Sequence, residues 1–133
     1  MPELDKSVPE AEEEAAVVAT DGSAVYVRLA PCDDIPLDRP RKIPVPGRPA
    51  VAVYRIGDEF FVTEDLCTHG NGSLSMGRIV EGGEIRCPVH RGTFDIRSGK
   101  AVKYPCTEPL MIFPTDVRDG DVWAALDNGY FAP

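Results

Sequence analysis

Two short ligand motifs constrain this chain more than any other feature of its sequence. Cys67 and His69 form a Cys-x-His pair, and Cys87 and His90 form a Cys-x2-His pair after a gap of seventeen residues. The chain contains only these two histidines. Thiolates and imidazoles are the side chains that bind soft and borderline transition metals. We therefore expect two facing loops that hold one metal centre between them.

The remaining sequence predicts a series of short β-strands. Runs rich in β-branched and aromatic residues recur, separated by Gly, Pro or Asp turn signals about every 8–12 residues. Two tight hairpins are predicted, over residues 50–63 and 79–86, and the second leads directly into Cys87. The Pro-rich segment 31–49 is expected to be a connection, because proline excludes a helix or a central strand. No segment has a sustained period of 3.6 residues, so the predicted fold class is all-β, an antiparallel sandwich or barrel.

Length and charge limit the domain organisation. At 133 residues the chain fits one domain. Its formal net charge is -8, and the first fourteen positions hold six acidic residues against one lysine. We therefore expect residues 1–22 to be a flexible acidic extension and residues 23–133 to be the folded domain. The chain has no basic patch for nucleic acid, no membrane-spanning run and no export signal, so we expect a cytoplasmic protein.

The distribution of ligand types favours a centre with two unlike ends. A structural zinc site accepts two thiolates and two imidazoles, but such sites usually pair Cys with Cys and His with His along the chain. Here each loop supplies one Cys and one His. Facing loops would therefore place Cys67 and Cys87 on one metal and His69 and His90 on another, as in a two-iron cluster. The zinc site remains the alternative at this point.

The segments around the ligands resemble a known family. Residues 67–70 (Cys-Thr-His-Gly) and 87–92 (Cys-Pro-Val-His-Arg-Gly) are similar to the two ligand loops of Rieske 2Fe-2S proteins. Further similarity, over roughly residues 24–127, is to the small Rieske ferredoxins of aromatic-ring-hydroxylating dioxygenases. The resemblance implies a Rieske-type antiparallel β-sandwich or barrel base with a small inserted cluster-binding lobe, about residues 64–107. It also implies one 2Fe-2S cluster, bound by Cys67, His69, Cys87 and His90 beneath a third loop that contains Pro105.

Two departures from the high-potential members of that family bear on the redox potential. Those proteins add a cysteine to each ligand loop, whereas residues 70–72 and Val89 hold none here. Their Ser and Tyr donors to the cluster sulfurs correspond to Gly92 and Phe94. Fewer donors stabilise the reduced, more negative cluster less. We therefore expect a potential at the low end of the Rieske range of roughly -150 to +300 mV.

The resemblance implies an electron carrier of aromatic hydrocarbon catabolism and not an enzyme. No nucleophile and base pair remains once both histidines are ligands, and the chain has no second ligand set for a mononuclear iron. The implied partners are a flavin-containing ferredoxin reductase and a terminal oxygenase, both bound transiently. The alternatives are a tightly bound small subunit of another reductase, such as nitrite reductase, and a structural zinc-binding module. The sequence identifies neither the oxygenase nor its substrate, and it assigns no role to Cys32 or Cys106.

Overall fold

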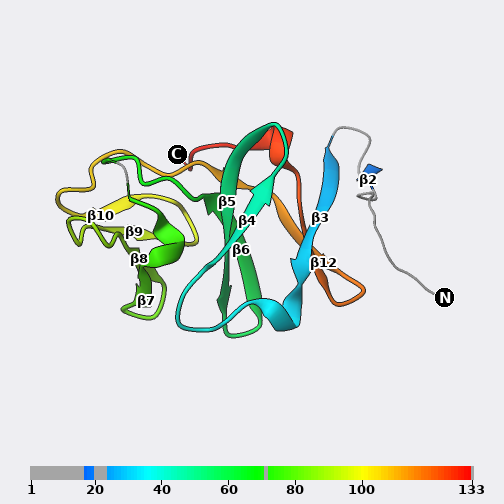
Figure 1. The fold of residues 1–133 in the computed structure, drawn as a ribbon, viewed down its shortest axis with the longest axis horizontal. Helices are drawn as coiled ribbons and strands as arrows, with labels where there is room; N and C mark the ends of the chain where they lie inside the picture. Colours follow the sequence, from blue (N-terminus) through cyan, green and yellow to red (C-terminus); the bar gives the residue numbers. More distant parts are fainter. Residues whose placement is uncertain (1–16, 20–23, 71, 133) are drawn as a thin grey trace.

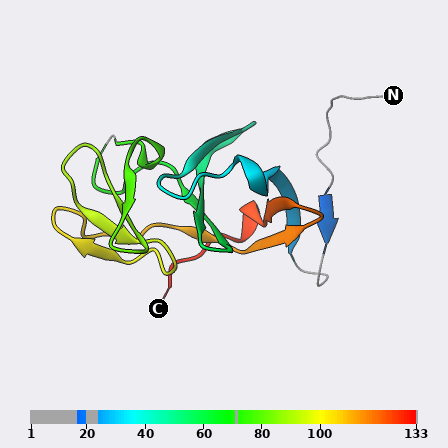
Figure 2. The same cartoon turned by 90° about the horizontal axis from the view of Figure 1, so that it is seen from below.

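Three antiparallel sheets follow one another along the molecule. The computed structural model describes residues 17–19, 24–70 and 72–132, and in these ranges the chain forms three four-stranded sheets. The sheet of strands β7–β10 lies at one end, the sheet built around β5 and β6 lies in the middle, and the sheet that contains β3 lies at the other end (Figures 1 and 2). This arrangement confirms the predicted all-β class.

The middle sheet contains the first predicted hairpin. Its order is β11-β6-β5-β4, and its strands are β4 (Arg41–Val45), β5 (Arg48–Ile56), β6 (Glu59–Glu64) and β11 (Ile112–Phe113). Ile56 pairs with Glu59, so a two-residue turn joins β5 to β6, and Gly57 supplies the left-handed backbone that the turn needs (φ 60°). Strand β6 ends three residues before Cys67. The hairpin therefore delivers the first ligand loop.

The Pro-rich segment differs from the expected connection, because it includes strand β4. Pro44 lies within β4, at an irregularity in its pairing with β5 between Ile43 and Val45. Strand β4 is at the edge of the sheet. Proline lacks a backbone donor, and an edge or a bulge is where a strand tolerates that loss.

The outer sheet has the order β12-β13-β3-β2. Its strands are β2 (Val17–Ala19), β3 (Val25–Pro31), β12 (Thr115–Arg118) and β13 (Asp121–Ala124). Strand β2 pairs antiparallel with residues 25–27 of β3. Residues 1–16 and 20–23 lie outside the described residues, so the predicted boundary of the extension at residue 22 stays a prediction.

The lobe sheet forms the end of the molecule that carries the ligand loops. Its order is β10-β9-β8-β7, and its strands are β7 (Arg78–Val80), β8 (Glu84–Arg86), β9 (Thr93–Asp95) and β10 (Ala101–Lys103). Strands β7 and β8 are the second predicted hairpin, which is confirmed. The chain passes from the end of β8 directly into Cys87.

Strand β5 contributes to two hydrophobic cores at once. Val51 and Val53 pack into the core between the middle and outer sheets, and Ala52 and Tyr54 pack into the core of the lobe. Successive side chains of a strand point to opposite faces, so a strand buried on both faces has an unbroken apolar run. The lobe core includes all three cysteines of the lobe region, and each is at most 4% exposed.

Three 3-10 turns complete the described structure: η1 (Cys32–Asp34), η2 (Leu74–Met76) and η3 (Leu126–Asn128). Within residues 17–19, 24–70 and 72–132, no helix has the length and apolarity that a membrane crossing requires.

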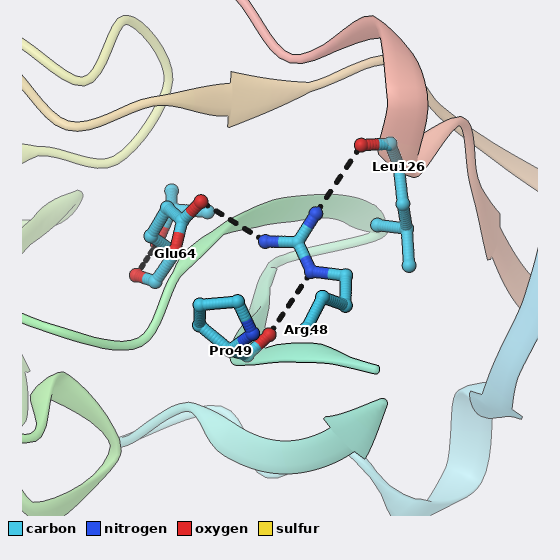
Figure 3. Close-up of polar contacts among 5 residues, drawn as sticks. Arg48, Pro49, Glu64 and Leu126 are labelled. Carbon is cyan, nitrogen blue, oxygen red and sulfur yellow. Dashed lines mark hydrogen bonds and ion pairs between the residues drawn. The ribbon is translucent and has the colours of Figure 1, made fainter. Parts of the chain in front are cut away.

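Arg48 ties the end of β6 to the C-terminal turn η3. Its guanidinium binds the Glu64 carboxylate at 2.9 Å, and it also donates to the backbone oxygens of Leu126 at 3.2 Å and Pro49 at 3.0 Å (Figure 3). The same group lies over the Phe113 ring, 5.1 Å from its centroid. Because β6 leads into the ligand loop, this contact anchors the strand that positions Cys67.

Candidate metal centre

Each ligand cysteine predicted from the sequence begins a loop that its own backbone closes. The Cys67 N–H donates to the Gly72 carbonyl at 2.9 Å, and the Cys87 N–H donates to the Gly92 carbonyl at 2.9 Å. The second loop is tightened further, because the Arg91 N–H donates to the Cys87 carbonyl at 2.9 Å. The two loops therefore present their cysteines in equivalent positions.

The structure brings together all four predicted ligands, and it sorts them by type. Cys67 and Cys87 are each 2% exposed and lie together in the lobe core. His69 and His90 are exposed, with their Nδ1 atoms 3.3 Å apart and their rings edge to face. Among the described residues, no group of three or more His, Cys, Asp or Glu side chains is arranged to bind a single metal ion. The donors form a buried thiol pair and an exposed imidazole pair.

The distance between the imidazoles suits two ligands of one metal. Histidine nitrogens bind a tetrahedral zinc ion at about 2.0–2.1 Å, which separates two of them by roughly 3.3 Å. The observed separation of the Nδ1 atoms is 3.3 Å. The imidazole pair can thus serve one metal ion, as one end of a two-iron cluster requires.

The surroundings of Cys87 combine burial with donors that stabilise its thiolate. Burial raises the pKa of the Cys87 thiol, and the neighbouring Cys67 raises it further. The backbone N–H groups of Val89 and His90 point at the Cys87 sulfur and act in the opposite direction. Metal binding removes the thiol proton, and these amide donors then remain to stabilise the bound thiolate. The donor set and its surroundings therefore fit a 2Fe-2S centre.

Two glycines permit the loops to approach one another. A Cβ built at Gly72 would lie 2.6 Å from the Cys87 sulfur, and one built at Gly92 would lie 2.6 Å from the Cys106 sulfur. Gly70, in contrast, has open space around it. Side chains at 72 and 92 would separate the first ligand loop from the second, and the second from the third.

Asp65 closes the base of the first ligand loop, and the sequence analysis did not identify it. Its carboxylate accepts hydrogen bonds from the Ser73 hydroxyl at 2.5 Å and from the Ser75 N–H at 2.9 Å, and the residue is 5% exposed. Its carbonyl accepts a bond from the Leu74 N–H at 2.8 Å. The signal in the sequence was the Ser-Leu-Ser run at 73–75, since serine and aspartate favour such local bonds.

Cys106 follows Pro105 in the third loop and also lies at the centre, although it was assigned no role from the sequence. It is 4% exposed and lies in the same core as Cys67 and Cys87. Burial raises the pKa of Cys106 to about 12, and the neighbouring Cys67 adds to the shift. The third loop, which carries Pro105, therefore covers the thiol pair with a neutral thiol. Cys32, the remaining cysteine, packs against the core between the middle and outer sheets.

Known proteins with the same features are found both by sequence and by structure. Residues 25–114 match the Rieske [2Fe-2S] domain. The chain is 39% identical to "Ferredoxin CarAc" of Metapseudomonas resinovorans, over 76% of this chain and 94% of that protein. It is 38% identical to the ferredoxin component of the p-cumate 2,3-dioxygenase system of Pseudomonas putida, over 73% of this chain and 82% of that protein. The solved ferredoxin of Sphingomonas yanoikuyae B1 has a TM-score of 0.70 and 39% identity, over 74% and 95% of the two chains.

Fold, donor chemistry and relatives agree on the class of protein: the chain belongs to the Rieske [2Fe-2S] family. Within that family its relatives are ferredoxin components of dioxygenase systems. The chain is accordingly a Rieske ferredoxin, an electron-transfer component and not a catalytic enzyme.

Proposed function

We propose that the chain carries single electrons from a flavin-containing reductase to a terminal aromatic-ring-hydroxylating oxygenase, using one 2Fe-2S cluster. The observation that carries the proposal is the sorted donor set: a thiol pair buried in the lobe, and an imidazole pair exposed beside it with 3.3 Å between the Nδ1 atoms. Exposed imidazoles give electrons a short path to a docked partner. Buried thiols exclude water from the other end of the cluster.

In this proposal Cys67 and Cys87 hold one iron, and His69 and His90 hold the other. The cluster supplies the redox chemistry, because it takes up and releases one electron. The chain supplies the rest: the backbone amides of Val89 and His90 stabilise a bound thiolate, and burial keeps the sulfurs dry. Imidazole ligands support a potential within the Rieske range, and the absence of hydroxyl donors at Gly92 and Phe94 supports the low end of that range, which a redox titration measures directly.

The domain limits and the location are part of the same proposal. The Rieske match over residues 25–114 supports a folded domain over residues 23–133, with the cluster-binding lobe at about 64–107. No disulfide joins any of the four cysteines, all of which lie among the described residues. Cysteines without disulfides are typical of the cytoplasm, which we expect to contain this protein.

The partners follow from the relatives. One relative, 39% identical, is found in a complex of reduced oxygenase and oxidized ferredoxin in carbazole 1,9a-dioxygenase, which supports an oxygenase as electron acceptor. A reductase is required to supply the electron. Nitrite reductase small subunits share the fold at 21% and 15% identity. A tightly bound reductase subunit thus remains the second candidate, and gel filtration of native lysate separates a free carrier from such a subunit.

The experiment that tests the ligands compares five serine or alanine variants. Cys67→Ser, Cys87→Ser, His69→Ala and His90→Ala should each lose iron and acid-labile sulfide, while Cys32→Ser, the matched control outside the lobe, should retain both. Purified wild-type protein should show a cluster absorbance that dithionite bleaches. Full cluster content in any of the four ligand variants would refute the ligand assignment. A colourless wild-type protein that contains zinc in place of iron would support the structural zinc alternative.

The test of function is electron transfer. Reduced wild-type protein should be oxidised by a terminal oxygenase component of an aromatic-ring dioxygenase system, and its oxidised form should be reduced by the flavoprotein reductase of the same system. A protein that is loaded with cluster but exchanges electrons with neither would contradict the proposed role.

A further inference from the structure

A basic groove lies directly beside Cys87, on the surface of the lobe. Its volume is about 250 Å³. It is lined by residues of η2, β7, β8 and the second ligand loop: Met76, Gly77, Arg78, Arg86, Cys87, Pro88 and Arg91. Three of these side chains are arginines, and Arg91 follows His90 directly. The groove therefore borders the second ligand loop, which carries His90.

The arginines concentrate positive charge that the fold does not neutralise. Arg78 and Arg86 lie directly opposite each other in the pairing of β7 with β8, an arrangement of like charges that destabilises a sheet. Arg78 has one ion pair, with Asp38 at 3.3 Å, but both side chains are 65% exposed and solvent screens such a pair. The side chains of Arg86 and Arg91 form no hydrogen bond or ion pair with any described residue. Their positive charges are available to a ligand from outside.

Backbone geometry holds the groove in place. A Cβ built at Gly77 would overlap the Arg86 carbonyl oxygen, so the residue after η2 contacts the β8 backbone without an intervening side chain. Arg91 has a left-handed backbone with φ 67°, which is uncommon for a residue with a side chain. Met76 forms part of the rim and is 76% exposed. These features give the groove a fixed wall and an accessible apolar edge.

The charge of the groove is opposite to that of the chain as a whole. The net charge is -8, yet residues 64–107 hold six Lys or Arg against five Asp or Glu, a net charge of +1 that leaves -9 for the rest. Such an asymmetry orients a protein in the field of its partner, with the lobe turned toward negative charge. A second and larger groove, of about 810 Å³, adjoins Cys67, but it is lined by apolar residues and by Glu64 and Glu108.

We propose that the groove of Arg78, Arg86 and Arg91 docks carboxylate side chains of the redox partner proteins. The proposal rests on the proposed function, because it assigns a contact surface to the carrier. Guanidinium groups bind carboxylates through two parallel hydrogen bonds, which fixes orientation as well as adding attraction. Carboxylates bound here place the partner over His90 and its neighbour His69. A carrier with one exposed imidazole pair presents the same surface to its donor and its acceptor.

The kinetic test compares charge variants of the cluster-loaded protein. Arg86→Gln combined with Arg91→Gln removes two charges from the groove, and Arg97→Gln combined with Lys100→Gln removes two charges from the lobe outside the groove. Stopped-flow mixing measures the rate at which each reduced protein is oxidised by the oxygenase of its own system. The potential of each variant is measured as well, so that rates are compared at known driving force.

The groove variant should react roughly tenfold more slowly at low ionic strength, the lower end of what focused charge adds to association rates. The difference should disappear at about 1 M salt, where the screening length falls to about 3 Å. Arg86→Lys combined with Arg91→Lys should recover most of the rate. Equal slowing in the groove variant and the Arg97/Lys100 control would overturn the proposal, because it would assign the effect to net charge alone.

A second measurement does not depend on the partner. Fluorescently labelled hexaglutamate should bind both the oxidised, cluster-loaded wild-type protein and the Arg97/Lys100 control. It should bind the groove variant several-fold more weakly. Labelled hexaglutamine, which carries no charge on its side chains, should bind none of the three proteins. Equal hexaglutamate binding by all three proteins, or tighter binding of a labelled single-stranded oligonucleotide, would contradict a carboxylate site. If wild-type protein reduces no oxygenase, the proposed function fails, and the peptide measurement still decides the groove.

Discussion

Gly92 allows the second ligand loop to contact the third, and its replacement by alanine tests whether this packing is required. The added Cβ would lie 2.6 Å from the Cys106 sulfur, 2.8 Å from the Lys103 carbonyl oxygen and 2.9 Å from the Cys106 nitrogen. Ordinary contact begins at 3.4 Å, so these atoms must retreat by 0.8, 0.6 and 0.5 Å. Two of the three are backbone atoms, which cannot move by a change of rotamer.

The expected loss of stability follows from that overlap. Inserting a methyl group into a well-packed site costs about 1–3 kcal/mol. For a chain of this length 1 kcal/mol corresponds to about 4 °C in Tm, so Gly92→Ala should melt roughly 4–12 °C below the wild type. The same displacement moves the third loop away from the loop that carries Cys87 and His90. The iron content of the purified variant should therefore fall as well.

Thermal melts followed by circular dichroism, at one scan rate, and the iron-to-protein ratio measure the two effects. Gly70→Ala is the matched control, because it adds the same methyl group to a ligand loop where no atom lies within 4 Å and the backbone is not left-handed. Gly70→Ala should match the wild type in both measurements. If Gly92→Ala also matched it, the close contact between the loops would not be needed, and the packing argument would be refuted.

Two further predictions concern buried polar groups behind the centre. Asp65→Ala leaves the hydroxyl and amide donors of the first ligand loop without their acceptor, so urea unfolding should show a free energy of unfolding lower by about 2–3 kcal/mol. Asp127→Ala, at an exposed position, is the control and should lower it by almost nothing. Equal losses in the two variants would contradict the loop-closing role of Asp65. Tyr54 is fully buried, with its hydroxyl 2.8 Å from the Thr63 hydroxyl, and burial raises the pKa of Tyr54. The contribution of Tyr54 to stability is therefore fully present below about pH 10, the pKa of tyrosine in the unfolded chain. That contribution is lost as the pH rises above this value, because the phenol ionises first in the unfolded chain. Above about pH 10 the wild type should therefore lose up to about 1.4 kcal/mol of stability per pH unit relative to Tyr54→Phe. At pH 7 the Tyr54→Phe variant should be about 1 kcal/mol less stable than the wild type. Parallel stability profiles of the two proteins from pH 7 to 11 would show that Tyr54 does not cause the alkaline loss.

Local sequence predicted the hairpins well because their determinants are local. The turn at Gly57 and Asp58 lies between two runs of β-branched and aromatic residues, and the structure closes β5 onto β6 there. The same reasoning missed strand β4, because proline argues against strands in general. Only the position of β4 at a sheet edge, with an irregularity at Pro44, makes a strand there compatible with proline.

The ligand set could be predicted from spacing, but its supporting residues could not. Asp65 was missed because its partners, Ser73 and Ser75, lie across a loop whose path the sequence does not specify. Cys106 was assigned no role because no His or Cys lies at ligand spacing from it, and only the fold shows that its thiol is buried with Cys67 and Cys87. The basic groove could not be predicted either, because only the tertiary structure sets Arg91 of the second ligand loop beside Arg78 and Arg86 of the predicted hairpin.

The sequence alone determined which donors the protein has, because two thiols and two imidazoles at these spacings admit few metal centres. It also determined the all-β class, since alternation and turn residues act over a few neighbouring positions. Tertiary structure decided how the donors are sorted, with the thiols buried and the imidazoles exposed, and which loops contact each other. Those outcomes depend on burial and close packing between segments far apart in the chain, and such contacts exist only once the sheets have assembled.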